Sequence, residues 1–71
     1  MNKINQRKLL NSKWTAVQPR EKEKHFLVSD IKFDDEGEVA LCLLEAVISR
    51  REESIDWTTL KNSEVWLQGW K

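Results

Sequence analysis

The sequence has one cysteine, one proline, two glycines and no tyrosine, and these scarcities exclude several classes of protein. A lone Cys42 cannot form an intramolecular disulfide, and Cys42 with the single histidine, His25, cannot supply the four ligands of a structural zinc site. No apolar run is long enough to cross a bilayer, and the first residues lack the apolar stretch of a secretory signal. We therefore expect a cytoplasmic protein with no membrane contact, no metal site and no small-molecule cofactor.

Four tryptophans in 71 residues are the most unusual feature that the chain does contain. A chain of this length forms a single small domain, 1–71, whose core needs large aromatic side chains because it has no disulfide or metal. Tryptophan either anchors such a core or offers a flat surface to a partner. We expect more indole here than the core requires, with the remainder displayed for binding.

The net charge is zero, but the charged side chains are segregated along the sequence. Residues 1–24 contain seven basic and two acidic side chains, whereas residues 25–49 contain one basic and six acidic ones. A neutral total argues against a general polyanion-binding protein, which normally carries a basic excess. The segregation still allows a local basic face in the N-terminal third.

The order of apolar and turn-forming segments predicts a mainly β protein. We expect helical turns within 2–11 and at 56–62, and strands at 12–17, 25–33, 39–48, 51–56 and 65–70. Five strands with one helical turn before the last strand are the order of elements in an SH3-like small barrel, and we predict that architecture. The alternative is an α+β fold in which 39–48 is a helix, because that segment is continuously apolar and rich in leucine and alanine.

Several local features follow from individual residues. Asn5 and Asp56 are candidate caps of the two helical turns. Pro19 is expected to end the first strand, so that residues 20–24 form a charged loop. Phe26 and Val28 alternate out of phase with Ile31 and Phe33, and a bulge at Ser29-Asp30 would return both pairs to the core. Further inward-facing residues are expected at Leu9, Leu10, Ile55 and Leu60.

The chain resembles a family of short, tryptophan-rich bacterial proteins of uncharacterised function. The resemblance rests on residues 8–10, 12–17, 23–26, 44–47, 55–57, 60–61 and the ending Trp66 to Trp70. It covers nearly the whole chain and implies a freestanding small protein. It implies no activity, cofactor or partner.

No group of residues has the pattern of a catalytic site. His25 and Cys42 could form a Cys–His pair only if the thiol were exposed and activated, and Cys42 stands among apolar residues typical of a buried thiol. The acidic run at 34–38 lacks the alternating spacing of a calcium loop, so a solvated hairpin turn is the better interpretation. We expect a protein that is not an enzyme.

Two binding functions are compatible with the sequence. In the first, RNA or single-stranded DNA binds with bases stacked on Trp14 or Trp70 and phosphates on a basic set. That set comprises Lys8, Lys13, Arg20, Lys22, Lys24, Arg50 and Arg51. In the second, a protein partner or another copy of the chain docks on a stripe formed by Trp66, Gln68 and Trp70, which alternate along the last strand.

Overall fold

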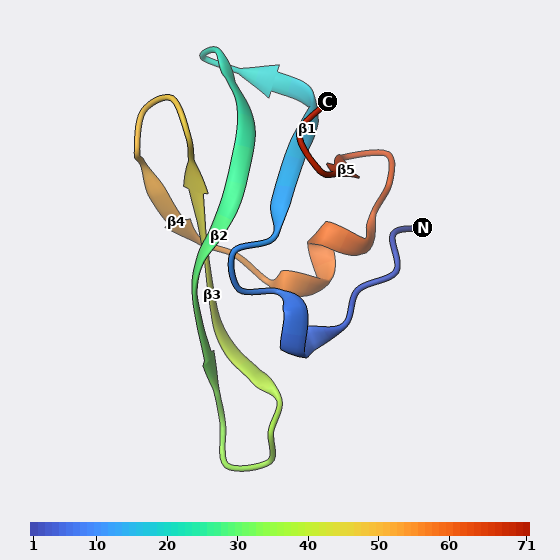
Figure 1. Ribbon diagram of the computed structural model, residues 1–71, viewed down its shortest axis with the longest axis vertical. Coiled ribbons are helices and arrows are strands. Elements are labelled where there is room, and N and C mark those ends of the chain that lie inside the picture. The colour runs from blue at the N-terminus through green and yellow to red at the C-terminus, as the bar shows by residue number, and fades with distance from the viewer.

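The computed structural model describes all residues from 1 to 71, and they form one antiparallel five-stranded sheet with two short 3₁₀ turns (Figure 1). The elements follow the order η1 (Gln6–Lys8), β1 (Lys13–Arg20), β2 (Glu23–Phe33), β3 (Val39–Ala46), β4 (Glu52–Ser54), η2 (Trp57–Lys61) and β5 (Trp66–Gln68). The mainly β class is confirmed. No helix is long and apolar enough to cross a membrane.

The sheet is open, so the predicted closed barrel is wrong. The strand order is β4-β3-β2-β1-β5, which places the last strand beside the first, but β4 and β5 each pair on one side only. Both edge strands are three residues long, too short to reach each other around the sheet. The free edge of β5 is instead covered by the N-terminal segment, since Asn2 Nδ2 donates to the Trp66 carbonyl (2.8 Å).

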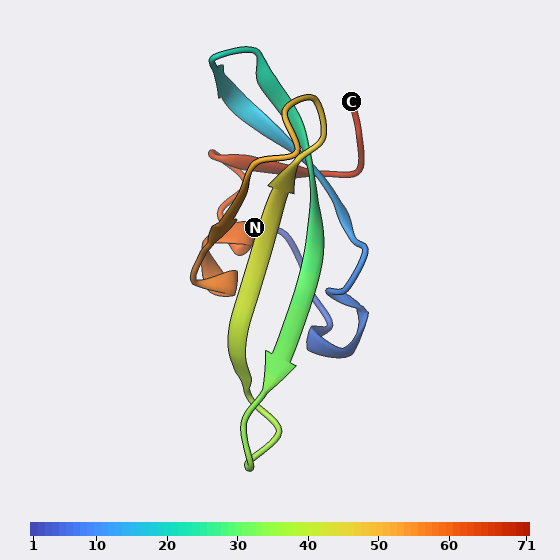
Figure 2. The ribbon, with the colours of Figure 1, turned by 90° about the vertical axis from the view of Figure 1, so that its left-hand side faces the viewer.

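The β2–β3 hairpin spans the length of the molecule and projects beyond the other strands at its far end (Figures 1 and 2). Residues 39–46 form strand, which rules out the helical alternative, and the strand ends two residues earlier than expected. The bulge between Val28 and Asp30 is confirmed by a register shift against β3. It returns Ile31 to the edge of the core, whereas Phe33 lies on the projecting part of the hairpin and is 47 % exposed.

The β1–β2 connection differs most from the prediction. Pro19 does not end β1, which continues to Arg20, and the turn consists of Glu21 and Lys22 alone. Both turn residues have positive φ (53° and 67°), as two-residue hairpin turns of the tightest type require. Glycine and asparagine usually occupy such positions. The sequence therefore contained no conventional signal for this turn.

Eight side chains form a core on one face of the sheet, covered by η1 and η2. Asn5 caps η1 by accepting a hydrogen bond from Arg7 N, and Asp56 caps η2 by accepting one from Thr58 N, as predicted. Leu60 is fully buried as predicted; Leu10, expected inside, is 50 % exposed. The core consists of Leu9, Trp14, Phe26, Val28, Cys42, Leu44, Ala46 and Leu60.

The candidate functional residues lie on two different faces of the sheet. Trp14, Phe26 and Ala46 are cross-strand partners, so they share the face that we call the core face. Side chains alternate along a strand, so Lys13 and His25 point to the opposite side, which we call the reverse face.

Candidate functional site

Trp70 is held on the reverse face in a partly exposed position. Gly69 has a φ of +83°, a conformation that side chains other than hydrogen rarely adopt, and it turns the chain after β5 back over β1. The indole N–H of Trp70 donates to the Phe26 carbonyl (2.9 Å), which fixes the ring while leaving the residue 43 % exposed. This ring is immobilised yet accessible, a combination that suits stacking.

The side chains of a lysine and a histidine lie next to the Trp70 ring. Lys13 Nζ lies 4.8 Å from the ring centroid, and the His25 ring centroid lies 5.9 Å away at an interplanar angle of 37°. His25 Nε2 also contacts the Lys71 carbonyl (3.1 Å). We call Lys13, His25, Trp70 and Lys71 the Trp70 cluster.

Hydrogen bonds connect β1, which lies beneath this cluster, to the C-terminal residues of the chain. Thr15 Oγ1 donates to the Gly69 carbonyl (2.7 Å) and accepts from Lys71 N (2.9 Å), and Gly69 N donates to the Lys13 carbonyl (2.7 Å). Thr15 is only 2 % exposed, and its two hydrogen bonds are partly buried. The position of the ring therefore follows from a buried polar network rather than from surface contacts alone.

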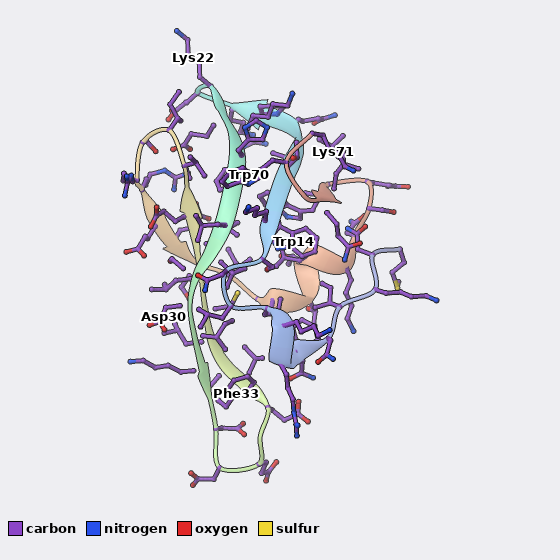
Figure 3. The ribbon with its side chains drawn as sticks, in the orientation of Figure 1. Trp14, Lys22, Asp30, Phe33, Trp70 and Lys71 are labelled. Atoms are coloured by element: carbon purple, nitrogen blue, oxygen red, sulfur yellow. The ribbon has the colours of Figure 1, made fainter.

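The rest of the predicted basic set is spread over the molecule. Lys22 lies at the tip of the β1–β2 turn, at the same end of the long axis as Trp70 and Lys71 (Figure 3), with Arg20 and Lys24 beside it in the chain. Lys8 belongs to η1 instead, and Arg50 to the β3–β4 turn. The acidic residues of the 34–38 turn occupy the far tip of the long β2–β3 hairpin, and Arg7 from the basic N-terminal part lines a pocket with Gly37 of that turn, so the charge segregation of the sequence is only partly kept in space.

Arg51 is already engaged by carboxylates. Its Nη2 and Nε bind the two carboxylate oxygens of Glu23 (2.6 and 3.1 Å), and its Nη1 binds Glu53 (2.6 Å). The hydrogen bonds from Arg51, and then one from Ser49, lower the pKa of Glu23, and the same Glu23 contact raises the pKa of Arg51. Arg51 therefore connects Glu23 of β2 to Glu53 of β4 through ion pairs at the surface.

Trp14 has no ring face free for a ligand. It is 2 % exposed, and its indole N–H donates to Ser12 Oγ (2.9 Å). Trp14 is therefore a core residue, and a base cannot stack on it as predicted. Trp57 is half-buried against the core, with Lys61 Nζ 4.8 Å from its ring centroid.

The expected stripe of Trp66, Gln68 and Trp70 does not form. Trp66 and Gln68 oppose Ala16 and Trp14 and therefore lie on the core face, whereas the Gly69 bend carries Trp70 to the reverse face. Trp66 packs edge-on against Phe26, with ring centroids 5.1 Å apart. Gln68 Nε2 donates to the Lys3 carbonyl (2.8 Å) and so helps to fasten the N-terminal segment.

His25 and Cys42 do not form a pair. Cys42 is 1 % exposed on the core face opposite Ile31, and burial raises the pKa of its thiol, which keeps it protonated. His25 lies on the other face, beside Trp70. In the acidic turn, Asp34 Oδ1 accepts hydrogen bonds from the backbone N–H groups of Glu36 and Glu38, which is a turn-stabilising role.

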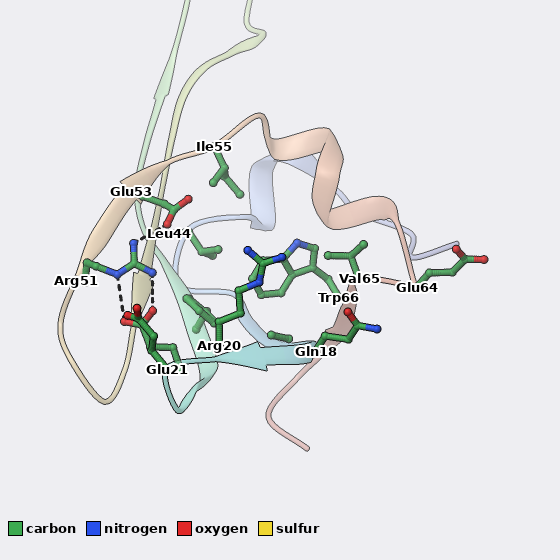
Figure 4. A pocket seen from close by; sticks show the side chains of 13 residues that line it. Gln18, Arg20, Glu21, Leu44, Arg51, Glu53, Ile55, Glu64, Val65 and Trp66 are labelled. Carbon is green, nitrogen blue, oxygen red and sulfur yellow. Dashed lines mark hydrogen bonds and ion pairs between the residues drawn. The ribbon is translucent and has the colours of Figure 1, made fainter.

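A groove of about 590 Å³ lies on the core face where the sheet stays open (Figure 4). Apolar side chains form its floor: Ala16, Phe26, Leu44, Ile55, Val65 and Trp66. Polar and charged side chains form its rim: Gln18, Arg20, Glu21, Glu23, Arg51, Glu53 and Glu64. The sequence did not predict this groove, since its walls come from five separate segments and its existence depends on the sheet not closing.

The fold and these two features define a small open-sheet β domain with an exposed tryptophan–lysine cluster on one face and a carboxylate-rimmed groove on the other. A family profile, Tryptophan-rich protein (DUF2389), matches residues 12–71, so the chain belongs to this uncharacterised family and the resemblance is confirmed. No curated protein and no solved structure matches the chain.

Proposed function

We propose that this protein binds single-stranded nucleic acid, RNA or DNA, through the Trp70 cluster on the reverse face. The observation that carries the proposal is the fixed, 43 % exposed indole of Trp70 with a lysine ammonium 4.8 Å from its ring centroid. Stacking of a base on an aromatic ring, with cations along the phosphates, is how single strands are held without sequence preference.

The distribution of charge supports one position for the bound nucleic acid on the surface of the protein. Lys13 and Lys71 adjoin Trp70, and Lys22 extends from the neighbouring turn at the same end of the molecule (Figure 3). Four carboxylates rim the groove on the core face, and phosphates would be repelled there. We therefore place the ligand on the reverse face, with Lys8, Arg20, Arg50 and Arg51 outside its path.

The competing function, docking of a protein on β5, has less geometric support. Its three residues lie on two faces, and Asn2 already occupies the free edge of β5 where an added strand would pair. It stays a prediction, and a measurement of oligomeric state by light scattering tests it.

The nucleic-acid proposal is tested by titrating labelled single-stranded oligonucleotides of mixed sequence and following fluorescence anisotropy at low salt. Replacing Trp70 by Leu should weaken binding by about 5-fold to 150-fold, the equivalent of one lost stacked base at about 1–3 kcal/mol. Circular dichroism confirms that the variant is folded.

Trp57→Leu is the matched control, because Trp57 also carries a lysine 4.8 Å from its ring but lies half-buried against the core. Its affinity for the oligonucleotides should equal that of the unmodified protein. The absence of binding by the unmodified protein at low salt, or equal losses in the two variants, would overturn the proposal.

A further inference from the structure

The groove on the core face is independent of the Trp70 cluster, because the two lie on opposite sides of the sheet. Its volume of about 590 Å³ is in the range of pockets that bind small groups. Trp66 is only partly buried at its floor, so a ligand can reach an aromatic surface there.

The charges at the rim are not balanced within the protein. Glu23 and Glu53 share one cation, Arg51, whereas Glu21 and Glu64 have no cationic partner within salt-bridge distance. Arg20 is the single unpaired cation of the rim, and its side chain points over the groove in Figure 4. The lining therefore holds four carboxylates and two guanidinium groups, and this excess of negative charge favours a cationic guest.

We propose that this groove binds the side chain of an arginine or lysine that a partner polypeptide presents. Such a side chain has an aliphatic stem that packs on apolar surface and a charged head that stays at a polar rim. The stem would cover Trp66 and Ile55, and the head would reach Glu21 or Glu64. An anionic group would meet the carboxylates, and a purely apolar one would leave them without a partner and partly desolvated.

An NMR titration with three short peptides tests this assignment. The peptides are identical except for a central arginine, citrulline or norleucine, which supply a charged head, a neutral head of the same shape, or no polar head. The arginine peptide should bind tightest and should shift the indole N–H signal of Trp66 while leaving that of Trp70 in place. Trp66→Phe identifies the signal.

Three variants separate charge complementarity from simple hydrophobic contact. Glu21→Gln with Glu64→Gln should weaken arginine-peptide binding by about 2-fold to 5-fold, the scale of the one exposed ion pair that the guest forms with either carboxylate. Arg20→Gln should strengthen it by about 2-fold to 5-fold, because it removes the one cation of the rim that has no carboxylate partner. Glu36→Gln with Glu38→Gln, the same charge change at the far tip of the β2–β3 hairpin, should leave the affinity unchanged.

The proposal is overturned if citrulline or norleucine binds as tightly as arginine, or if the hairpin-tip variant weakens binding as much as the rim variant. It is also overturned if the arginine peptide shifts no groove signal at millimolar concentration.

Discussion

Trp57 and Trp70 make the same contact in two different settings. Each ring has a lysine Nζ 4.8 Å from its centroid. Lys61 is four residues from Trp57 within η2, so its contact follows from local helical geometry, whereas Lys13 reaches Trp70 from another strand. Trp57 packs half-buried against the core, and Trp70 lies outside it on the reverse face.

The difference shows that a tryptophan–lysine contact does not by itself make a binding site. A cation near an indole contributes about 0.5–1 kcal/mol in an exposed setting, in the local pair and the distant pair alike. What distinguishes Trp70 is that a bend at Gly69 and a hydrogen bond to Phe26 hold the ring outside the core. The candidate site is therefore identified by the exposed and fixed position of Trp70, and not by the lysine beside it.

Leu60→Ala is expected to have the largest effect on stability, and it tests whether η2, which carries Trp57, packs against the core. Leu60, three residues after Trp57 in η2, is fully buried, so Leu60→Ala should lower the free energy of unfolding by about 2–5 kcal/mol. Leu67→Ala, on β5 near Trp70, removes a side chain that is 37 % exposed and should cost about 0.5 kcal/mol. Urea denaturation measures both values, and similar losses would show that the two positions do not differ in burial.

The second prediction separates the two lysines. Lys13→Gln should reduce the slope of log K against log salt for single-stranded oligonucleotides by about 0.7, the share of one phosphate contact. Lys61→Gln should leave that slope unchanged, because its ammonium lies beside Trp57, which packs against the core and not on the reverse face. The slope is obtained from titrations at several salt concentrations. An equal decrease in both variants would assign the nucleic acid to both faces.

Much of the fold could be predicted from short-range patterns in the sequence. The caps at Asn5 and Asp56 and the bulge near Ser29 depend on residues close together in the chain, and all three are present. The open edge could not be predicted, because it depends on how far β4 and β5 extend and on Asn2 reaching the Trp66 carbonyl from the other end of the chain. The Glu21-Lys22 turn was missed because neither residue usually adopts a positive φ.

The candidate site was predicted in part. Exposure of Trp70 near basic residues was an expectation of the sequence, and the structure adds Lys13 and His25 as its neighbours. Alternation along the last strand predicted a common face for Trp66 and Trp70, and the left-handed Gly69 breaks that alternation. A period of two holds only while the strand continues, and β5 ends at Gln68.

The third prediction concerns the pH dependence of stability, which we expect to depend on Glu23 at the groove and not on the Trp70 cluster. The pKa of Glu23 is lowered by the Arg51 and Ser49 hydrogen bonds, so the ionised carboxylate favours the folded state. This contribution is present above the ordinary pKa of about 4.3 and is lost as pH falls through the lower folded-state value. Glu23→Gln should therefore lower the Tm at pH 7 and flatten its decline in acid.

Oligonucleotide binding is the control for that variant. Because Glu23 lies at the groove and not in the Trp70 cluster, Glu23→Gln should bind oligonucleotides at pH 7 with unchanged affinity. An unchanged Tm profile would show that the Glu23–Arg51 pair does not couple stability to pH. A loss of oligonucleotide binding would show that the two faces are coupled.

The smallest effect is expected at the cap that precedes Trp57. Asp56 Oδ1 accepts hydrogen bonds from the Thr58 hydroxyl (2.7 Å) and the Thr58 backbone N–H (3.0 Å), and these lower the pKa of Asp56. Asp56→Ala removes the acceptor and should lower the Tm slightly, whereas Asp56→Asn keeps an oxygen acceptor and should lower it less. Thermal unfolding followed by circular dichroism compares the two. If both variants lose the same stability, the negative charge and not the acceptor oxygen stabilises the turn.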